Sequence, residues 1–234
     1  MRRTAIVTGA SRGLGLELAR ALAQRNWAIA IDARHAGPLE AVRKELASLT
    51  SVVALPGDVR DSSHLAELVE EAGRLGPLAA VINNASLLGP SPQPRLASYP
   101  IPALREVYEA NVLAPLRLIQ LALPHLEERA RIVNVTSDAG VESYEGWGGY
   151  GSSKAALEHV SSILGAEHPE LRVYWVDPGD MRTQMQQEAF PGEDISDRPP
   201  PSDSLPGFLA LLEGDLPSGR YRASEVLAAQ QVHT

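Results

Sequence analysis

Two hydrophobic periods alternate along the N-terminal two thirds of the chain. Short runs rich in β-branched residues predict strands, and longer segments with apolar residues three and four positions apart predict helices. The predicted strands are RTAIVT, WAIAID, SVVALPGD, LAAVINNAS, ARIVNVTS and LRVYWVDPG. The predicted helices cover about residues 14–25, 38–49, 62–76, 103–126 and 150–167.

Strands that alternate with helices of this length predict βαβ units, and therefore an α/β fold whose parallel sheet is covered on both faces. No internal repeat or long linker interrupts the pattern, so we expect one domain over residues 1–234. The exception is the segment 180–205, which contains FPGEDISDRPPPSDS and is too rich in proline and acid for a core. We expect this segment to be a substrate lid or a solvated loop.

Composition narrows the function classes. The formal net charge of −8 is opposite to that of a phosphate-tracking surface, so we expect no nucleic-acid partner. No apolar run approaches the roughly 18 residues of a membrane span, and the N-terminus turns polar too early for a signal peptide. Cysteine is absent and the six histidines lack metal-site spacing, so we predict no metal site. These observations favour a cytoplasmic protein without a membrane partner.

A glycine-rich turn follows the first predicted strand. The segment TGASRGLG places Gly9, Gly13 and Gly15 between a strand and a helix. A phosphate bound there needs bare backbone N–H groups and the positive end of a helix. This strand–turn–helix context predicts a nucleotide site.

The segment YGSSK places Tyr150 and Lys154 four residues apart, on one face of a predicted helix. A free phenol has a pKa near ~10, and a neighbouring ammonium lowers that value because it stabilises the phenolate. Such a pair favours proton exchange between Tyr150 and a substrate oxygen. On its own the pair is also compatible with a surface accident.

The glycine spacing resembles the T-G-x-x-x-G-x-G motif of the short-chain dehydrogenase/reductase (SDR) family. The family's other motifs follow in order over about residues 3–184. They are GDV at 57–59, NNAS at 83–86, Asn111 in ANVLAP, Ser137 in NVTS, Tyr150 with Lys154, and DPGDMRT at 177–183. The chain departs from the pattern at Ser86, where the family has glycine, and after Thr183, where no strong match continues.

The resemblance implies a Rossmann-type, doubly wound three-layer sandwich with a central parallel sheet. It also implies an NAD(P)-dependent oxidoreductase that transfers hydride between NADP(H) and a carbonyl compound or secondary alcohol. The catalytic residues would be Asn111, Ser137, Tyr150 and Lys154. Tyr150 would be the general acid and base, Ser137 would bond the substrate oxygen, and Lys154 would also bind the cofactor ribose.

By the same resemblance a set of residues surrounds the cofactor, with Asp58 holding the adenine amino group. The cofactor-binding set is Gly9, Ser11, Arg12, Gly13, Leu14, Gly15, Arg34, Asp58, Val59, Asn84, Ala85, Tyr150, Lys154, Pro178, Gly179, Met181 and Thr183.

The choice of cofactor depends on the end of the second strand. NAD-preferring members resemble one another in placing an acid 18 residues after the third glycine, which here is Ala33 and not Asp32. Successive strand side chains point to opposite faces, so Asp32 should face away from the ribose. Arg12 and Arg34 then favour NADP, since guanidiniums grip a 2′-phosphate. A one-residue slip at Asn26 would return Asp32 to the ribose, so NAD stays possible.

Pro115 stands four residues after Asn111 in the fourth predicted helix. Proline has no N–H, so the carbonyl of Asn111 loses its donor and we expect the helix to kink there. We expect a water on the freed carbonyl to relay protons from Lys154, although Pro115 could also merely bend the helix around the core.

Substrate and assembly are the least defined features. Tyr144, Trp147, Met181, Met185 and Phe190 could line an apolar pocket or could simply pack in the core. The resemblance implies a homodimer or homotetramer, for which Leu113, Leu116 and Leu157 could supply contacts. A catalytically silent nucleotide sensor or scaffold on the same fold is the alternative function.

Overall fold

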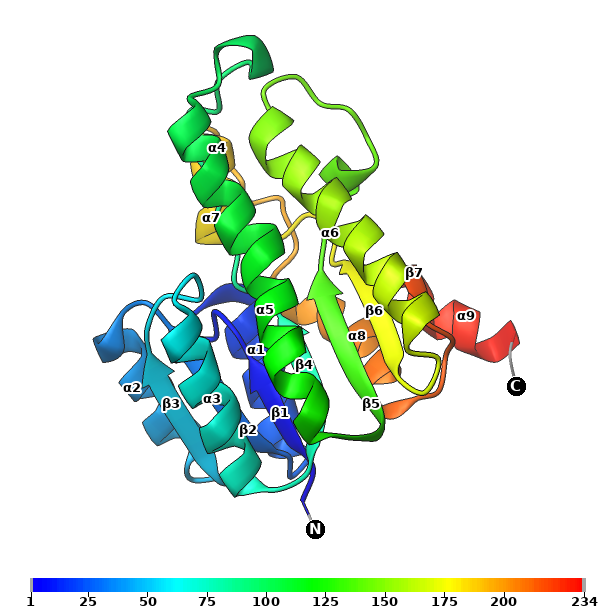
Figure 1. The fold of residues 1–234 in the computed structure, drawn as a ribbon. Helices are drawn as coiled ribbons and strands as arrows, with labels where there is room; N and C mark the ends of the chain where they lie inside the picture. The colour runs from blue at the N-terminus through cyan, green and yellow to red at the C-terminus, as the bar shows by residue number, and fades with distance from the viewer. Residues whose placement is uncertain (1, 233–234) are drawn as a thin grey trace.

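The computed structural model describes residues 2–232, which form a seven-stranded sheet covered by helices (Figure 1). The seven strands are all parallel, in the order β3-β2-β1-β4-β5-β6-β7. The chain builds the sheet outward from β1 in one direction as far as β3, and then in the other direction from β4 onward. This topology confirms the predicted doubly wound fold. The strands are β1 (Thr4–Val7), β2 (Ala28–Ala33), β3 (Val52–Pro56), β4 (Leu78–Asn83), β5 (Leu126–Val135), β6 (Arg172–Asp177) and β7 (Gly219–Arg222).

Nine α-helices connect these strands or follow them in the described chain. They are α1 (Gly13–Gln24), α2 (Ala36–Leu46), α3 (Ser62–Leu75), α4 (Ile101–Tyr108), α5 (Ala114–Ala122), α6 (Gly148–Glu167), α7 (Gln184–Ala189), α8 (Leu205–Glu213) and α9 (Val226–Val232).

The helices form two layers because side chains of each strand alternate between the sheet's faces. Ala5 and Val7 of β1 pack with α1, α2 and α8 in one apolar cluster. Ile6, between them, packs with α3 and α5 in a second cluster. The central strands are therefore buried on both faces, which explains why their sequences are almost continuously apolar.

The predicted helix at 103–126 differs from the structure in two ways. A π-helical turn, Glu109–Leu113, separates α4 from α5, and the N–H of Ala114 donates to the carbonyl of Glu109. This break lies where Pro115 removes a donor, as the sequence predicted. The helix also ends sooner than predicted, because a 3₁₀ turn, Leu123–His125, leads directly into β5.

The C-terminal third adds elements that the sequence analysis did not predict. Helix α8 buries Phe208, Leu211 and Leu212 against the first cluster, and β7 pairs with β6 at the edge of the sheet. One assembly contact also needs correction. Leu157, offered as a contact between subunits, is buried within the chain, whereas Leu113 is exposed.

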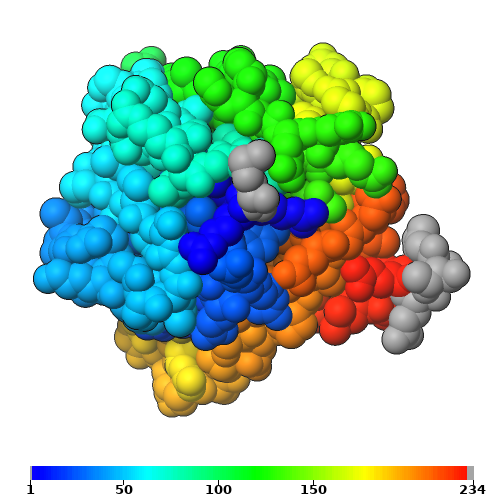
Figure 2. All heavy atoms as spheres, turned by 90° about the horizontal axis from the view of Figure 1, so that it is seen from below, coloured from blue at the N-terminus to red at the C-terminus, as the bar shows by residue number. Residues whose placement is uncertain are grey.

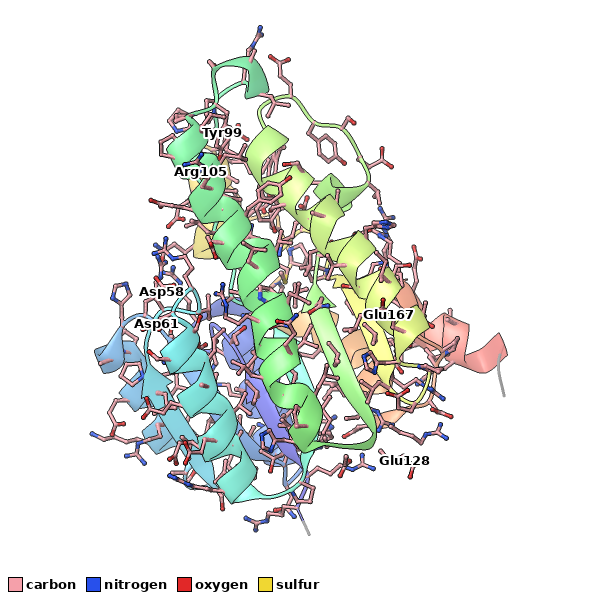
Figure 3. The ribbon with its side chains drawn as sticks, viewed as in Figure 1. Asp58, Asp61, Tyr99, Arg105, Glu128 and Glu167 are labelled. Atoms are coloured by element: carbon pink, nitrogen blue, oxygen red, sulfur yellow. The ribbon has the colours of Figure 1, made fainter. Side chains whose placement is uncertain are left out.

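The two ends of the sheet differ in what they carry. Seen from below, the blue N-terminal residues lie between the light-blue segments and the orange C-terminal segments (Figure 2). In Figure 3 Asp58 lies at the upper end of the sheet, just after β3, whereas Glu128 lies at the lower end.

No helix of the described residues is long and apolar enough to cross a membrane. Within residues 2–232 no group of His, Asp or Glu side chains has metal-site geometry.

Candidate active site

The glycine-rich turn lies at the carboxyl end of β1 and has little room for side chains. Gly9 and Gly13 adopt left-handed φ angles of +67° and +57°, which favour glycine. A Cβ on Gly15 would lie 2.4 Å from Nδ2 of Asn84. Helix α1 starts at Gly13 without a side-chain cap from Arg12, so its first N–H groups are open to a ligand. The cradle therefore fits a dinucleotide phosphate.

Residues at the end of β4 hold the turn in place. Asn84 donates from Nδ2 to the carbonyl of Thr8 over 2.8 Å. The hydroxyl of Thr8 accepts from the backbone N–H groups of Asn84 and Ala85, each over 3.0 Å. Ser11 is half-buried on the turn, and Leu14 is buried in the core beneath it.

Asp32 braces the same turn from below. Its side chain is fully buried, and it accepts from the N–H of Gly9 over 2.8 Å. Its second oxygen lies 3.1 Å from Nε2 of His64 on α3, and this hydrogen bond raises the pKa of His64 despite burial. Asp32 thus points into the sheet–α3 layer, while Ala33 joins the opposite cluster. Asp32 and Ala33 therefore lie on opposite faces of the sheet, as the alternation of strand side chains predicts.

Arginine side chains lie near the glycine-rich turn and the carboxyl ends of β2 and β3. Arg34 is exposed just after β2, and its charge helps to lower the pKa of Asp58. The main cause of that lowering is Arg60, whose Nε and Nη2 donate to the Asp58 carboxylate over 3.0 and 2.8 Å. Arg12 donates to Gln184 of α7, and this hydrogen bond links the glycine-rich turn to the 180–205 segment. Val59 packs at the edge of the second apolar cluster.

Tyr150 and Lys154 lie together on α6, as the sequence predicted. The Nζ atom of Lys154 is 5.4 Å from the centre of the Tyr150 ring and donates to the carbonyl of Val135 over 2.7 Å. Burial lowers the pKa of Lys154 to about 7, and Glu158 opposes that shift. The expected lowering of the Tyr150 pKa is wrong. Burial raises that pKa, and a hydrogen bond with Ser86 only partly offsets the rise.

Ser137 follows β5 and caps a 3₁₀ turn, Asp138–Gly140. Its hydroxyl donates to the carboxylate of Asp138 over 2.9 Å and accepts from the N–H of Ala139. Among the described residues no hydrogen bond joins Ser137 to Tyr150. The Ser137 hydroxyl would therefore have to leave Asp138 before it could donate to another oxygen.

Asn111 lies in the π-helical turn and fixes the loop after β4. Its Oδ1 accepts from the N–H of Leu87 over 2.7 Å and from the hydroxyl of Ser86 over 3.1 Å. Its Nδ2 donates to the carbonyl of Leu87 and to the hydroxyl of Ser153, each over 2.9 Å. Ser86, where the SDR pattern has glycine, therefore touches both Asn111 and Tyr150.

The segment after β6 lies near both the glycine-rich turn and the Tyr150 cluster. The carbonyl of Pro178 accepts from Ser204, and Gly179 has a φ of +78°. A Cβ on Gly13 would lie 3.6 Å from Cγ2 of Thr183, which also caps α7. Met181 is partly buried and packs against the main apolar cluster.

Aromatic and apolar side chains cover Tyr150. The ring of Trp147 lies 5.8 Å from that of Tyr150 and 5.9 Å from that of Phe190, centre to centre. Met185 and Ala189 of α7 pack against the same cluster. The 180–205 segment is thus ordered, and it contacts the site through α7.

Three charged residues near the site were missed by the sequence analysis: Asp138, Glu158 and Arg220. Asp138 directly follows Ser137, and Glu158 stands one helical turn after Lys154, so their positions held a signal. Arg220 held none, because it comes from β7 and meets the site only through sheet pairing.

A glycine-rich turn at the switch point of a doubly wound sheet, facing a buried tyrosine and lysine, defines a Rossmann-type nucleotide-binding enzyme site. Residues 3–194 match the family model described as short chain dehydrogenase. The chain therefore belongs to the short-chain dehydrogenase family of oxidoreductases.

Individual relatives differ in what they act on. A benzil reductase of Saccharomyces cerevisiae that forms (S)-benzoin is 31% identical over 80% of this chain and 75% of its own length. The L-fucose dehydrogenase of Mus musculus is 31% identical over 97% of this chain and 80% of its own. A Shigella flexneri short-chain dehydrogenase solved with NADP has a TM-score of 0.85 and 29% identity, and covers 94% of this chain and 96% of that one.

Proposed function

We propose that this protein is an NADP(H)-dependent oxidoreductase that interconverts a carbonyl compound and a secondary alcohol. One observation carries the proposal. The Tyr150 hydroxyl lies buried in an apolar cluster beside Lys154, at the sheet end that also carries the glycine cradle. A buried phenol that keeps its proton near neutrality is suited to protonate a carbonyl oxygen.

The chain's own residues would act on the substrate oxygen. When bound, the reduced nicotinamide supplies hydride to the carbonyl carbon. Tyr150 then gives its proton to the oxygen, and in the reverse direction it accepts that proton from the alcohol. Ser137 donates a hydrogen bond to the same oxygen, and charged Lys154 stabilises the phenolate that Tyr150 becomes. Asn111 holds the Ser86–Leu87 loop beside them.

Preference for NADP(H) rests on the rim of the nucleotide half. Asp32 is buried and bonded to Gly9 and His64, so it does not face a ribose. Arg34 is exposed at the same strand end, where it can pair with a 2′-phosphate. A solved relative that carries NADP supports this choice.

Dissociation constants for NADPH and NADH test the preference. We expect tighter NADPH binding and a selective loss for Arg34→Ala of about tenfold or more, the value of one charged hydrogen bond. Arg43→Ala is the control, since Arg43 lies on α2 and pairs with Glu40. Tighter NADH binding in the wild type would contradict the assignment.

The substrate would carry a flat apolar group. Trp147 and Phe190 lie beside Tyr150, and Met185 adds a deformable side chain from α7. We propose that the 180–205 segment of this single domain is the lid that closes on that group. The resemblance to a benzil reductase supports aryl ketones, and the equal identity to an L-fucose dehydrogenase makes aldoses the competing class to test.

Loss of NADPH absorbance with a panel of aryl ketones, aliphatic ketones and aldoses tests the function. We expect turnover with aryl ketones and loss of most of it in Tyr150→Phe, while NADPH still binds. Tyr221→Phe is the matched control, because its hydroxyl donates to the carbonyl of Pro217 outside the site. NADPH binding without turnover of any panel member would favour the silent sensor.

We also propose that the protein is a homodimer or homotetramer. Leu113 beside α5 and Ile163 on α6 are exposed apolar side chains that suit a contact between subunits. Light scattering at micromolar concentration checks this, and a monomer would contradict it.

A further inference from the structure

Arg220 of β7 joins three segments that end at the candidate active site. Its Nε donates to both carboxylate oxygens of Glu158 on α6, each over 3.1 Å. Its Nη2 donates to the carbonyl of Ser137 over 3.4 Å and lies 3.7 Å from Oδ2 of Asp177. One guanidinium thus ties α6 to the ends of β5 and β6.

Each partner of Arg220 is a near neighbour, in sequence or through a hydrogen bond, of a residue in or beside the candidate active site. Glu158 stands one helical turn after Lys154, and its Oε1 also accepts from the hydroxyl of Thr136 over 2.7 Å. The other oxygen of Asp177 accepts from the N–H of Gly179 over 2.9 Å, in the loop that follows β6. The network therefore touches the Ser137 backbone, the Lys154 helix and this loop.

The network is buried enough to be rigid. The side chains of Glu158 and Asp177 are 11% and 4% exposed, and that of Arg220 is 26% exposed. Buried carboxylates are stable only when they are paired and hydrogen-bonded. Nε of Arg220 holds both oxygens of Glu158 while Nη2 reaches the Ser137 carbonyl and Asp177, a planar spread of donors that lysine cannot reproduce.

Glu158 also acts on Lys154 through charge. Burial disfavours the Lys154 ammonium, and Glu158 is the carboxylate that opposes this effect. Tyr150 lies over Lys154 on its own helix, and Asp138 and Asp177 face Tyr150 from the strand ends. Because Arg220 neutralises Glu158, it sets how much of that negative charge reaches Lys154.

We propose that Arg220 and Glu158 are positioning residues of the reaction: together they hold the Ser137 backbone against α6, Glu158 favours the charged form of Lys154, and Arg220 limits that effect. The proposal rests on the proposed function. Arg220 lies outside residues 3–194, the part that matches the family model.

The lysine content of the chain makes a direct test possible. Lysine occurs only at Lys44 and Lys154, so protein labelled with ¹³C at lysine Cε gives two signals. Lys44 is exposed and serves as the internal reference. A pH titration then reports the Lys154 pKa without any need for turnover.

We expect Glu158→Gln to lower the Lys154 pKa on the order of one unit, because a nearby carboxylate is lost. Arg220→Met should raise that pKa, since Glu158 then acts unneutralised. Arg220→Lys should restore the pKa, because it restores the charge. Arg222→Met is the control, since Arg222 shares Asp177 but bonds neither Glu158 nor Ser137. A merely structural role would lower the unfolding midpoint and leave the Lys154 pKa unchanged.

Turnover with a ketone accepted by the wild type supplies the second readout. Arg220→Met should lose kcat on the order of 10²-fold with little change in NADPH affinity, because the catalytic groups are displaced. Arg220→Lys should recover only part of kcat, since it lacks the fork. Wild-type Lys154 pKa and kcat in folded Arg220→Met would overturn the proposal. Absent turnover in the wild type would reject the proposed function instead, and the titration would still decide the role of Arg220.

Discussion

The glycine-rich turn and the Tyr150 helix are each braced by a buried carboxylate, but the two carboxylates have different partners. Asp32 pairs with His64, whose charge depends on pH near neutrality. Glu158 pairs with Arg220, whose charge does not. The comparison indicates that the Asp32–His64 contact that supports the glycine-rich turn is sensitive to pH, whereas the Glu158–Arg220 contact that supports α6 is not.

The largest effect should come from filling the nucleotide cradle. In Gly15→Ala the new Cβ would meet Nδ2 of Asn84 at 2.4 Å and the Gly9 carbonyl oxygen at 2.5 Å. Such overpacking costs about 1–3 kcal/mol, and we expect NADPH affinity to fall on the order of 10²-fold. Isothermal titration measures this. Gly37→Ala is the control, because nothing lies within 4 Å of its Cβ. Unchanged affinity in Gly15→Ala would show that the cradle does not hold the cofactor.

Removal of the Asp32 carboxylate should have the next largest effect. Asp32→Ala leaves the Gly9 N–H and the His64 ring without their partner, and such losses cost about 2–3 kcal/mol. Urea unfolding monitored by fluorescence measures the change. Asp61→Ala, which removes only the exposed cap of α3, should cost about 1 kcal/mol. Equal losses of unfolding free energy in the two variants would show that the contacts of Asp32 with Gly9 and His64 add no more stability than an exposed helix cap.

The pH dependence of stability sharpens the comparison. The pKa of His64 is raised in the folded protein by its bond to Asp32, so the stabilisation is complete below the unfolded pKa of roughly 6.5. It should be lost as pH rises through the higher folded pKa. Urea unfolding from pH 5 to 9, a range set by roughly these values, checks this. Lys154, whose lowered pKa makes stability rise with pH, adds a slope of opposite sign to each protein. The His64 contribution is therefore the difference in free energy of unfolding between the wild type and Asp32→Ala, which should shrink as pH rises. The same difference measured in the Arg220→Met background should shrink equally. A difference that stays constant with pH would contradict the assignment to His64.

The smallest effect concerns Tyr99, which packs against Gly149 at the start of α6 (Figure 3). Its hydroxyl is buried, and within residues 2–232 it has no hydrogen-bond partner. Tyr99→Phe should therefore leave stability unchanged or raise it by about 1 kcal/mol, because a desolvated polar group is removed. Thermal unfolding measures this shift. Destabilisation would show that the hydroxyl has a partner.

What the sequence could predict followed local signals. Glycines between a strand and a helix, and a tyrosine four residues before a lysine, specify their own surroundings. The break at Pro115 was predictable because proline has no N–H. Contacts made by sheet pairing were not predictable, and Arg220 reaches the site only because β7 lies beside β6. The pKa of Tyr150 was misjudged because burial outweighs charge there, and burial depends on the packing of distant segments.

Hydride transfer itself is tested most directly with NADPH deuterated at the transferable position of the nicotinamide. The wild-type enzyme and an accepted aryl ketone should give an alcohol that carries deuterium on the carbinol carbon. Tyr150→Phe should bind the same NADPH and form almost no labelled alcohol. NADPH bound by the wild type with no labelled alcohol from any ketone of the panel would contradict the assignment of this protein as a carbonyl-reducing enzyme.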